Sequence, residues 1–197
     1  MQPSICSLLL KHNAFVINET NPFTWSSGMT MPFYCDNRVL LSFPESRKII
    51  IDEFCQLINP HITKKTAIVG IATAGIPWAS FLAAHFQLPL TYIRPVPKNH
   101  GRAKTIEGEL FPDQEILLIE DLISTGKSSA KAITLLQENG FKVKYLFAIF
   151  SYGFKESHNL FKQLEIPYKT LTNFNKLQKE LNTPITFNEK QKELFFD

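Results

Sequence analysis

The sequence predicts an α/β fold in which a doubly wound, mainly parallel sheet carries a small hood over its ligand site. Apolar segments short enough for strands alternate with segments of helical periodicity. Two of the strand-to-helix junctions consist of small and hydroxyl side chains, as at the ligand-binding edge of parallel sheets. A chain of 197 residues can form one core and a small accessory lobe. We therefore expect one domain over residues 1–197, with a hood made of residues 1–41 and part of the C-terminus.

The composition is ordinary for a globular protein, with 44% hydrophobic and 20% charged residues. The formal net charge of +3 is too small to favour nucleic acid as a partner, although basic residues gather at 94–104. Three widely spaced cysteines indicate neither a zinc site nor a disulfide framework. The N-terminal apolar run at residues 8–10 is too short for a signal peptide or a membrane span. We therefore expect a cytoplasmic protein that binds neither nucleic acid nor membranes.

Periodicity and composition place the elements along the chain. A helix should begin at Ser42, because Glu45 completes a capping-box pattern ahead of an apolar face at residues 49–58. Aromatic and turn-forming residues at 23–41 indicate a small antiparallel unit, which we interpret as part of the hood. The remaining strands are expected at residues 14–17, 67–71, 90–94, 116–119, 143–150 and 168–171, and the remaining helices at residues 5–10, 76–86, 127–139, 154–164, 174–181 and 188–195.

The most informative stretch is residues 116–128. Its first four residues are apolar without polar alternation, which indicates a strand buried on both faces, and they lead into Glu120 and Asp121. The turn at residues 124–128 then opens a helix, so its backbone N–H groups and hydroxyls can converge at the positive helix end, as phosphate binding requires. Because adjacent carboxylates accept hydrogen bonds from vicinal hydroxyls, the best-fitting ligand is a sugar phosphate.

Two other interpretations of this stretch stay open. Residues 126–128, Gly-Lys-Ser, also end the nucleotide-triphosphatase loop, but that motif requires a glycine where this chain has Asp121. In the second interpretation the segment is a surface turn whose carboxylates only face water. Acidic pairs are common at strand ends, although they seldom come with a complete hydroxyl-glycine turn.

A second junction lies at residues 72–75, Ala-Thr-Ala-Gly. It joins an expected strand to a helix with Pro77 in its first turn, so it should lie at the same ligand-binding edge. The alternative is a tight turn that only closes the strand onto the helix, for which glycine is needed too.

Residues 95–111 lack apolar periodicity and contain two prolines and two glycines. A loop of this length in a compact protein is usually a functional lid or disordered, and we interpret it as a lid. Arg94, Lys98 and His100 could neutralise an anionic leaving group, but each basic residue taken alone could also be a solvated loop charge, which is the better interpretation of Arg102 and Lys104.

These motifs resemble the type I phosphoribosyltransferase family, in which residues 116–128 look like the signature for 5-phosphoribosyl pyrophosphate (PRPP). Two further groups of residues resemble the orotate phosphoribosyltransferases within that family. They are residues 92–101 with 106–108, and residues 23–28 with Pro32, Tyr34, 36–38 and 42–45. The resemblance covers roughly residues 20–153, and its motifs occur in the family's order.

The resemblance implies a type I phosphoribosyltransferase fold and the conversion of PRPP and orotate to orotidine 5'-monophosphate and pyrophosphate in pyrimidine synthesis. It also implies Mg2+ carried mainly by PRPP, and a homodimer in which the lid at residues 95–111 is shared between subunits. Lys98, His100 and Asp121 are implied as catalytic, and Ser124 as an orotate contact. PRPP binding is implied for Arg94, Lys98, His100, Glu120, Asp121, Leu122, Ile123, Ser124, Thr125, Gly126, Lys127 and Ser128, with Thr73, Ala74 and Gly75 against the pyrophosphate.

Several positions depart from the family pattern. Pro95 stands where a lysine often contacts pyrophosphate, Ser26 and Thr30 replace frequent hood lysines, and Ser151 lies where an arginine is often found. Two alternatives therefore stay open: a phosphoribosyltransferase for another nucleobase, and a non-catalytic PRPP-binding regulator on the same fold. The presence of both Lys98 and His100 argues against the regulator.

Overall fold

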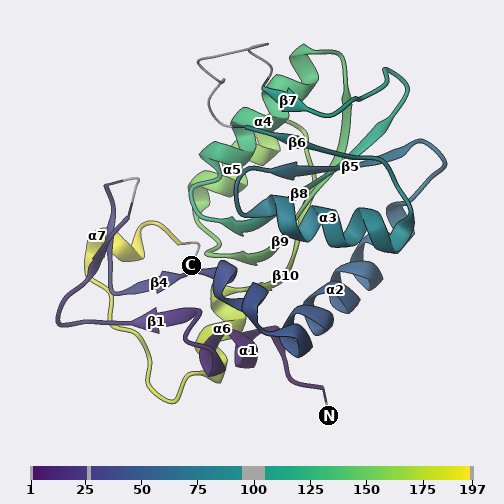
Figure 1. Ribbon diagram of the computed structural model, residues 1–197. Helices are drawn as coiled ribbons and strands as arrows, with labels where there is room; N and C mark the ends of the chain where they lie inside the picture. Colours follow the sequence, from purple (N-terminus) through teal and green to yellow (C-terminus); the bar gives the residue numbers. More distant parts are fainter. Residues whose placement is uncertain (1, 26–27, 95–104, 196–197) are drawn as a thin grey trace, which may run out of the picture.

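A computed structural model describes residues 2–25, 28–94 and 105–195 of the protein. In this part of the chain, the central sheet has six strands in the order β10-β9-β8-β5-β6-β7 (Figure 1). Neighbouring strands from β10 to β6 are parallel, and only the edge strand β7 is antiparallel. The strands are β5 (Thr66–Ile71), β6 (Leu90–Ile93), β7 (Ile106–Glu107), β8 (Glu115–Ile123), β9 (Lys142–Ser151) and β10 (Tyr168–Asn173). This arrangement confirms the predicted α/β fold with a mainly parallel sheet.

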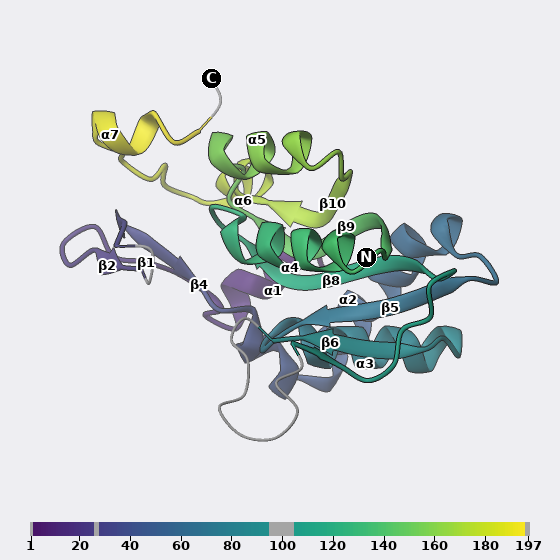
Figure 2. The same ribbon diagram turned by 90° about the horizontal axis from the view of Figure 1, so that it is seen from above.

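Helices cover both faces of this sheet. Seen from above, α4 (Lys127–Glu138) and α5 (Lys155–Gln163) lie on one side, and α3 (Gly75–Phe86) lies on the other (Figure 2). Helix α2 (Pro44–Ile58) packs against α3, and a short 3-10 helix, η2 (Asn59–His61), follows it. In the described part of the chain, none of the helices has the length and apolarity needed to span a membrane.

Two hydrophobic cores follow from this layering, because strand β8 is buried on both faces. Leu117 and Ile119 belong to the core shared with α2 and α3, whereas Ile116 and Leu118 belong to the core under α4. All four side chains are fully buried. The unbroken apolar run at residues 116–119 therefore reflects a central strand, as the sequence predicts.

The hood is built from both ends of the chain. Strand β1 (Phe15–Ile17) pairs antiparallel with β4 (Phe33–Cys35), and β2 (Phe23–Thr24) pairs antiparallel with β3 (Thr30–Met31). The other elements of the two ends are α1 (Ile5–Lys11), the 3-10 helix η1 (Asn37–Ser42), α6 (Phe174–Glu180) and α7 (Glu189–Lys192). Figures 1 and 2 both show β1, β4 and α7 together beyond one end of the sheet.

Specific contacts join the two ends of the chain in this hood. The side-chain amide of Gln191 in α7 donates to the backbone carbonyl of Thr30, at 3.0 Å. The ring of Phe33 stacks on Phe174 with centroids 4.7 Å apart and meets Phe187 edge-on at 6.1 Å. The C-terminal segment thus packs on the N-terminal strands through an aromatic cluster.

Three local predictions are corrected by the structure. The capping box at Ser42 is wrong: Ser42 ends η1, and α2 starts after Phe43 without a side-chain cap, because Pro44 sets the first helical turn. The stretch predicted to lack regular structure contains β7, which adds to the sheet edge beside β6. Strand β8 continues to Ile123, so the two acidic residues lie within the strand rather than after it.

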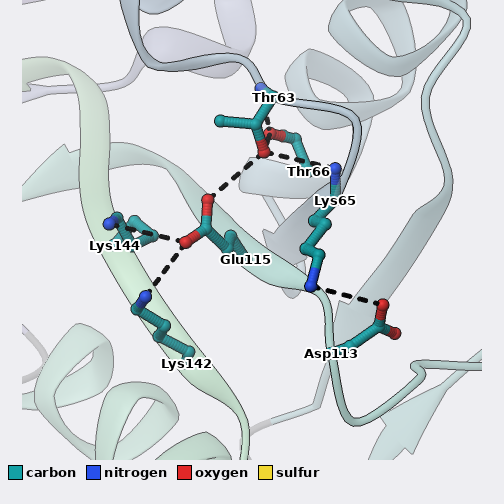
Figure 3. Close-up of polar contacts among 7 residues, drawn as sticks. All are labelled: Thr63, Lys65, Thr66, Asp113, Glu115, Lys142 and Lys144. Carbon is teal, nitrogen blue, oxygen red and sulfur yellow. Dashed lines mark hydrogen bonds and ion pairs between the residues drawn. The ribbon is translucent and has the colours of Figure 1, made fainter.

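At the amino-terminal edge of the sheet, charged side chains form ion pairs and hydrogen bonds with one another (Figure 3). Glu115, the first residue of β8, lies 3.0 Å from the ammonium of Lys142 and 3.6 Å from that of Lys144, both in β9. Its second carboxylate oxygen accepts a hydrogen bond from the Thr63 hydroxyl at 3.2 Å. The hydrogen bond from Lys142 lowers the pKa of Glu115, so this carboxylate is stabilised in its charged form.

Candidate active site

The opposite, carboxyl-terminal edge of the sheet brings together the motifs that the sequence singled out. Because β5, β6, β8 and β9 are parallel, the segments that follow them all emerge at this edge. The small-residue loop at 72–75 follows β5, Arg94 follows β6, and the turn at residues 124–128 follows β8. Residues 95–104, including Pro95, Lys98, His100, Arg102 and Lys104, and the hood residue Ser26 lie outside the described residues.

Gly75 allows the first of these loops to lie directly on β8. A Cβ atom at this position would be 2.5 Å from the carbonyl oxygen of Ile119 and 3.3 Å from the Cα of Glu120. The glycine therefore has the packing role foreseen in the tight-turn interpretation, and the same contact places the loop beside the acidic pair. Thr73 is exposed, Ala74 precedes α3 without a side-chain cap, and the peptide bond between Ala72 and Thr73 is cis.

The turn at residues 124–128 has the geometry of a phosphate site. Gly126, with φ of 79°, immediately precedes α4 and provides no side-chain cap. An added Cβ would lie 3.0 Å from both Phe161 and Ser157 of α5, so this position requires glycine for conformation and for space. The first amides of a 12-residue helix are thus open to an anion at its positive end. Lys127 points towards α5, where its ammonium lies 3.0 Å from the Glu156 carboxylate.

Glu120 and Asp121 form an acidic pair that, in the described part of the chain, has no ion-pair partner. Glu120 is 6% exposed, and its carboxylate accepts the backbone N–H of Asp121 at 3.0 Å. Burial raises the pKa of Glu120 well above its usual value, and the nearby Asp121 adds to the effect. Burial also raises the pKa of Asp121, although the hydrogen bond to Glu120 and the charge of Arg38 oppose this. Unlike Glu115, this pair favours ligands that bring hydrogen-bond donors or positive charge.

The hood is fastened to this edge by two residues that the sequence analysis did not single out. Asn37, fully buried at the start of η1, donates its side-chain amide to the backbone carbonyl of Asp121 at 2.8 Å. The hydroxyl of Tyr152 accepts the backbone N–H of Cys35 at 3.0 Å, and its ring stacks on Trp25 with centroids 4.5 Å apart. Asn37 lies in a segment quoted for the family resemblance, which was the only available signal for it, whereas Tyr152 lies beside Ser151, where the chain departs from the family pattern.

Three other residues considered in the sequence analysis occupy defined places. The guanidinium of Arg94 lies 3.6 Å from the Glu107 carboxylate in β7, and the side chain is half-buried. Thr30 lies in β3, where its carbonyl holds Gln191, and Ser151 is buried at the end of β9, where its hydroxyl accepts the N–H of Gly153. Neither Thr30 nor Ser151 supplies a cation at this edge.

The groups at the carboxyl-terminal edge of the sheet favour one class of ligand. Strand β8 carries the buried Glu120 and the half-buried Asp121 near its end, a glycine turn after the strand presents open helix amides, and a second small-residue loop lies against the same strand. Open amides fit a phosphate group, and carboxylates with raised pKa fit hydroxyl donors. The arrangement therefore suits a phosphorylated sugar, as the sequence predicts.

Comparison with known sequences gives a consistent result. The sequence profile of the phosphoribosyl transferase domain matches residues 40–183 of this chain. A Cytophaga hutchinsonii protein named orotate phosphoribosyltransferase is 46% identical over 172 residues, covering 87% of this chain and 82% of that protein. A Staphylococcus saprophyticus protein of the same name is 44% identical over 177 residues, covering 90% of this chain and 87% of that protein.

Solved structures show the same relationship. The orotate phosphoribosyltransferase of Aeropyrum pernix superposes with a TM-score of 0.79 and 27% identity, covering 89% of this chain and 97% of that chain. An adenine phosphoribosyl transferase of Trypanosoma brucei superposes with a TM-score of 0.65 and 16% identity, covering 92% of this chain and 88% of that chain. At that identity the second match speaks for the fold alone.

Proposed function

The chain belongs to the phosphoribosyltransferase family, among the orotate phosphoribosyltransferases, and from this we propose that it transfers the 5-phosphoribosyl group of PRPP to orotate. The products are orotidine 5'-monophosphate and pyrophosphate, in a step of pyrimidine synthesis. The observation that carries the proposal is the buried acidic pair directly before open helix amides at one edge of the sheet. A ribose that carries a 5'-phosphate presents its hydroxyls and its phosphate to these two groups.

We assign the donor site as follows. The backbone of residues 124–128 holds the 5'-phosphate, with Leu122 and Ile123 leading into it, and Glu120 with Asp121 accepts hydrogen bonds from the ribose hydroxyls. Thr73, Ala74 and Gly75 lie against the pyrophosphate, which Arg94, Lys98 and His100 neutralise, and Ser124 contacts orotate. Glu120 and Asp121 support these roles because they are held side by side at the strand end.

The reaction needs no nucleophile from the protein. Displacement at the anomeric carbon develops positive charge on the ribose and negative charge on the leaving pyrophosphate. We propose that the carboxylate of Asp121 stabilises the positive charge on the ribose, and that Lys98 and His100 stabilise the negative charge on the pyrophosphate. The half-buried position of Asp121 supports this role, because electrostatic stabilisation is stronger where water is partly excluded.

Mg2+ would arrive with PRPP, which would supply most of its oxygen ligands. The ion would add to the neutralisation of the pyrophosphate that we assign to Arg94, Lys98 and His100.

The assembly and location belong to the same proposal. We propose a single domain, a homodimer in which the lid at residues 95–111 completes the site of the neighbouring subunit, and a cytoplasmic location. The separation of the lid cations from the acidic pair along the sequence supports a site that two chains can share.

The test is to follow the ultraviolet absorbance of orotate with PRPP and Mg2+, beside parallel reactions with uracil, hypoxanthine and adenine. Consumption of orotate with release of pyrophosphate is the expected result. Turnover of another base instead of orotate would identify a different phosphoribosyltransferase. PRPP binding without turnover of any base would identify the non-catalytic regulator.

A further inference from the structure

Orotate carries a carboxylate, so its site needs a positive charge. This inference rests on the proposed function. The family pattern described in the sequence analysis implies a cation at the positions of Thr30 and Ser151, and neither residue can supply one. A different cation near the acidic pair must therefore balance the substrate's charge if orotate binds beside the ribose.

Arg38 is the cation that the structure places at this position. It is the second residue of η1, directly after Asn37, whose side chain is hydrogen-bonded to the backbone of Asp121. The charge of Arg38 lowers the pKa of Asp121, although by less than burial raises it. Arg38 thus lies on the hood side of the site, within electrostatic reach of the residue that we assign to the ribose.

The guanidinium of Arg38 is held in place but not saturated. Asp36 binds it with two hydrogen bonds, from Nε at 2.6 Å and from Nη2 at 2.8 Å, and also accepts the backbone N–H of Arg38 at 3.1 Å. A guanidinium has five N–H donors, and among the residues that the structure describes only Asp36 bonds this one, so the remaining donors can bind a second carboxylate. The Arg38 side chain is 58% exposed, which leaves it accessible to a ligand.

An exposed aromatic ring lies in the same segment of the hood. The alternation of β4 buries Phe33 and Cys35 and leaves Tyr34 exposed, two residues before the Asp36 that holds the guanidinium. An exposed ring and an oriented guanidinium in one short segment suit a flat anion, which can use both its face and its charged edge.

We propose that Arg38 binds the carboxylate of the pyrimidine base, that Asp36 is the positioning residue that orients its guanidinium, and that Tyr34 flanks the ring of the base. The planar guanidinium provides the geometry and charge that a carboxylate requires. In this chain it takes over the task for which Thr30 and Ser151 lack a charge.

The test compares Arg38→Gln and Arg38→Lys with a control, Lys48→Gln, which removes an exposed cation paired with Asp52 on α2. The KM for orotate is measured at saturating PRPP, and the KM for PRPP at saturating orotate. Loss of a charge-assisted hydrogen bond predicts that Arg38→Gln raises the orotate KM about 10- to 100-fold. The PRPP KM of Arg38→Gln should stay within about twofold of the wild-type value, and so should both KM values of Lys48→Gln. Arg38→Lys should give a smaller rise in orotate KM, because lysine keeps the positive charge and loses only the planar, two-point hydrogen bonding of the guanidinium.

Asp36→Asn separates positioning from folding. If Asp36 only orients Arg38, this variant should raise the orotate KM less than Arg38→Gln does, while the melting temperatures of the two variants stay similar. The preference for orotate over uracil, which lacks the carboxylate, should fall in the same order.

Two results would overturn the inference: an orotate KM that both Arg38 variants leave unchanged, or an equal rise in the KM values for orotate and PRPP. If Arg38→Gln does not fold, Arg38→Lys decides alone by the same two criteria. A wild-type protein that does not consume orotate refutes the proposed function. A wild-type protein that consumes orotate beside Arg38 variants with normal orotate KM refutes only the role of Arg38.

Discussion

Glu120 and Asp121 are neighbours in one strand, yet their environments differ in a way that assigns their tasks. Glu120 is buried, and its carboxylate accepts a hydrogen bond from the backbone N–H of Asp121. Asp121 is half-buried, and the charge of Arg38 in the hood lowers its pKa. A half-buried carboxylate can contact a ligand and still gain from a low local dielectric. Asp121 is therefore the better candidate for direct contact with the developing charge on the ribose.

Replacing Asp121 by Asn should lower kcat by about 10²–10³-fold, if its contribution resembles that of one charge-stabilising donor at a transition state. The amide keeps the shape but loses the charge, so PRPP affinity should change less than turnover. Steady-state kinetics with orotate and PRPP measure both constants. A kcat within threefold of wild type, with an unchanged melting temperature, would remove Asp121 from the assigned catalytic residues.

Glu120 and Glu115 lie in the same strand and should affect stability in opposite directions. The pKa of Glu120 is raised in the folded protein, so its contribution to stability falls as pH rises above its ordinary pKa of about 4.5. Glu120→Gln should therefore raise the melting temperature, more at pH 8 than at pH 5, while it lowers activity. The expected gain in the free energy of unfolding at pH 8 is about 1–3 kcal/mol, the cost of burying an incompletely compensated polar group.

The matched control is Glu115→Gln at the other end of β8. The pKa of Glu115 is lowered by Lys142, so its contribution is present above its ordinary pKa and is lost as pH falls. This variant should lower the free energy of unfolding at pH 8 by about 0.5–1 kcal/mol, as for a surface ion pair, and leave activity unchanged. Melting curves at both pH values check the two signs, and equal pH dependence in the two variants would contradict them.

At the scale of elements, the site depends on how closely helices approach the end of β8. Gly75 brings α3 onto the strand from one side, and Gly126 lets α4 start where α5 leaves no room for a side chain. Helix α3 thus begins against the acidic strand, and α4 begins against α5, four residues after that strand ends. The same two glycines therefore serve packing and ligand geometry together.

Replacing Gly75 by Ala should be costly, because the added Cβ would lie 2.5 Å from the Ile119 carbonyl. Overpacking of this kind destabilises by about 1–3 kcal/mol, and here it should also displace the strand end and lower kcat/KM. Gly140→Ala is the control: its φ of 81° is also unfavourable for alanine, but nothing lies within 4 Å of the added Cβ and the site is distant. Denaturant unfolding and kinetics should show stability loss in both variants and activity loss only in Gly75→Ala.

For the whole molecule, the proposed sharing of the lid would make catalysis a property of two chains. The lid cations Lys98 and His100 and the acidic pair lie in different segments, and in the proposed homodimer each site takes the lid from the neighbouring chain. Defects in the two parts should then complement each other in a mixed dimer.

Lys98→Ala and Asp121→Asn chains, each inactive alone, should recover activity when they are unfolded, mixed in equal amounts and refolded. Random pairing gives one intact site in half of the dimers, so about a quarter of wild-type activity is expected. The control mixes Asp121→Asn with Glu120→Gln, whose defects lie in the same segment and should not complement. Absence of recovery in the first mixture, with both variants dimeric by light scattering, would refute the shared site.

The sheet, the turn that precedes α4 and the family can be predicted from the sequence alone. Residues 116–119 are buried on both faces and residues 124–128 open a helix, and both features are local patterns of hydrophobicity and turn chemistry. Local patterns also misled at Ser42, where Pro44 rather than a side-chain cap begins the helix.

Contacts between distant segments bring further residues to the site. Asn37 and Tyr152 carry no periodic signal, and their hydrogen bonds form because the hood folds back over the ends of β8 and β9. The raised pKa of Glu120 likewise depends on complete burial, and the lowered pKa of Glu115 on lysines 27 and 29 residues further along the chain. Contacts between segments far apart in the sequence depend on chain topology, which hydrophobic spacing within one segment does not encode.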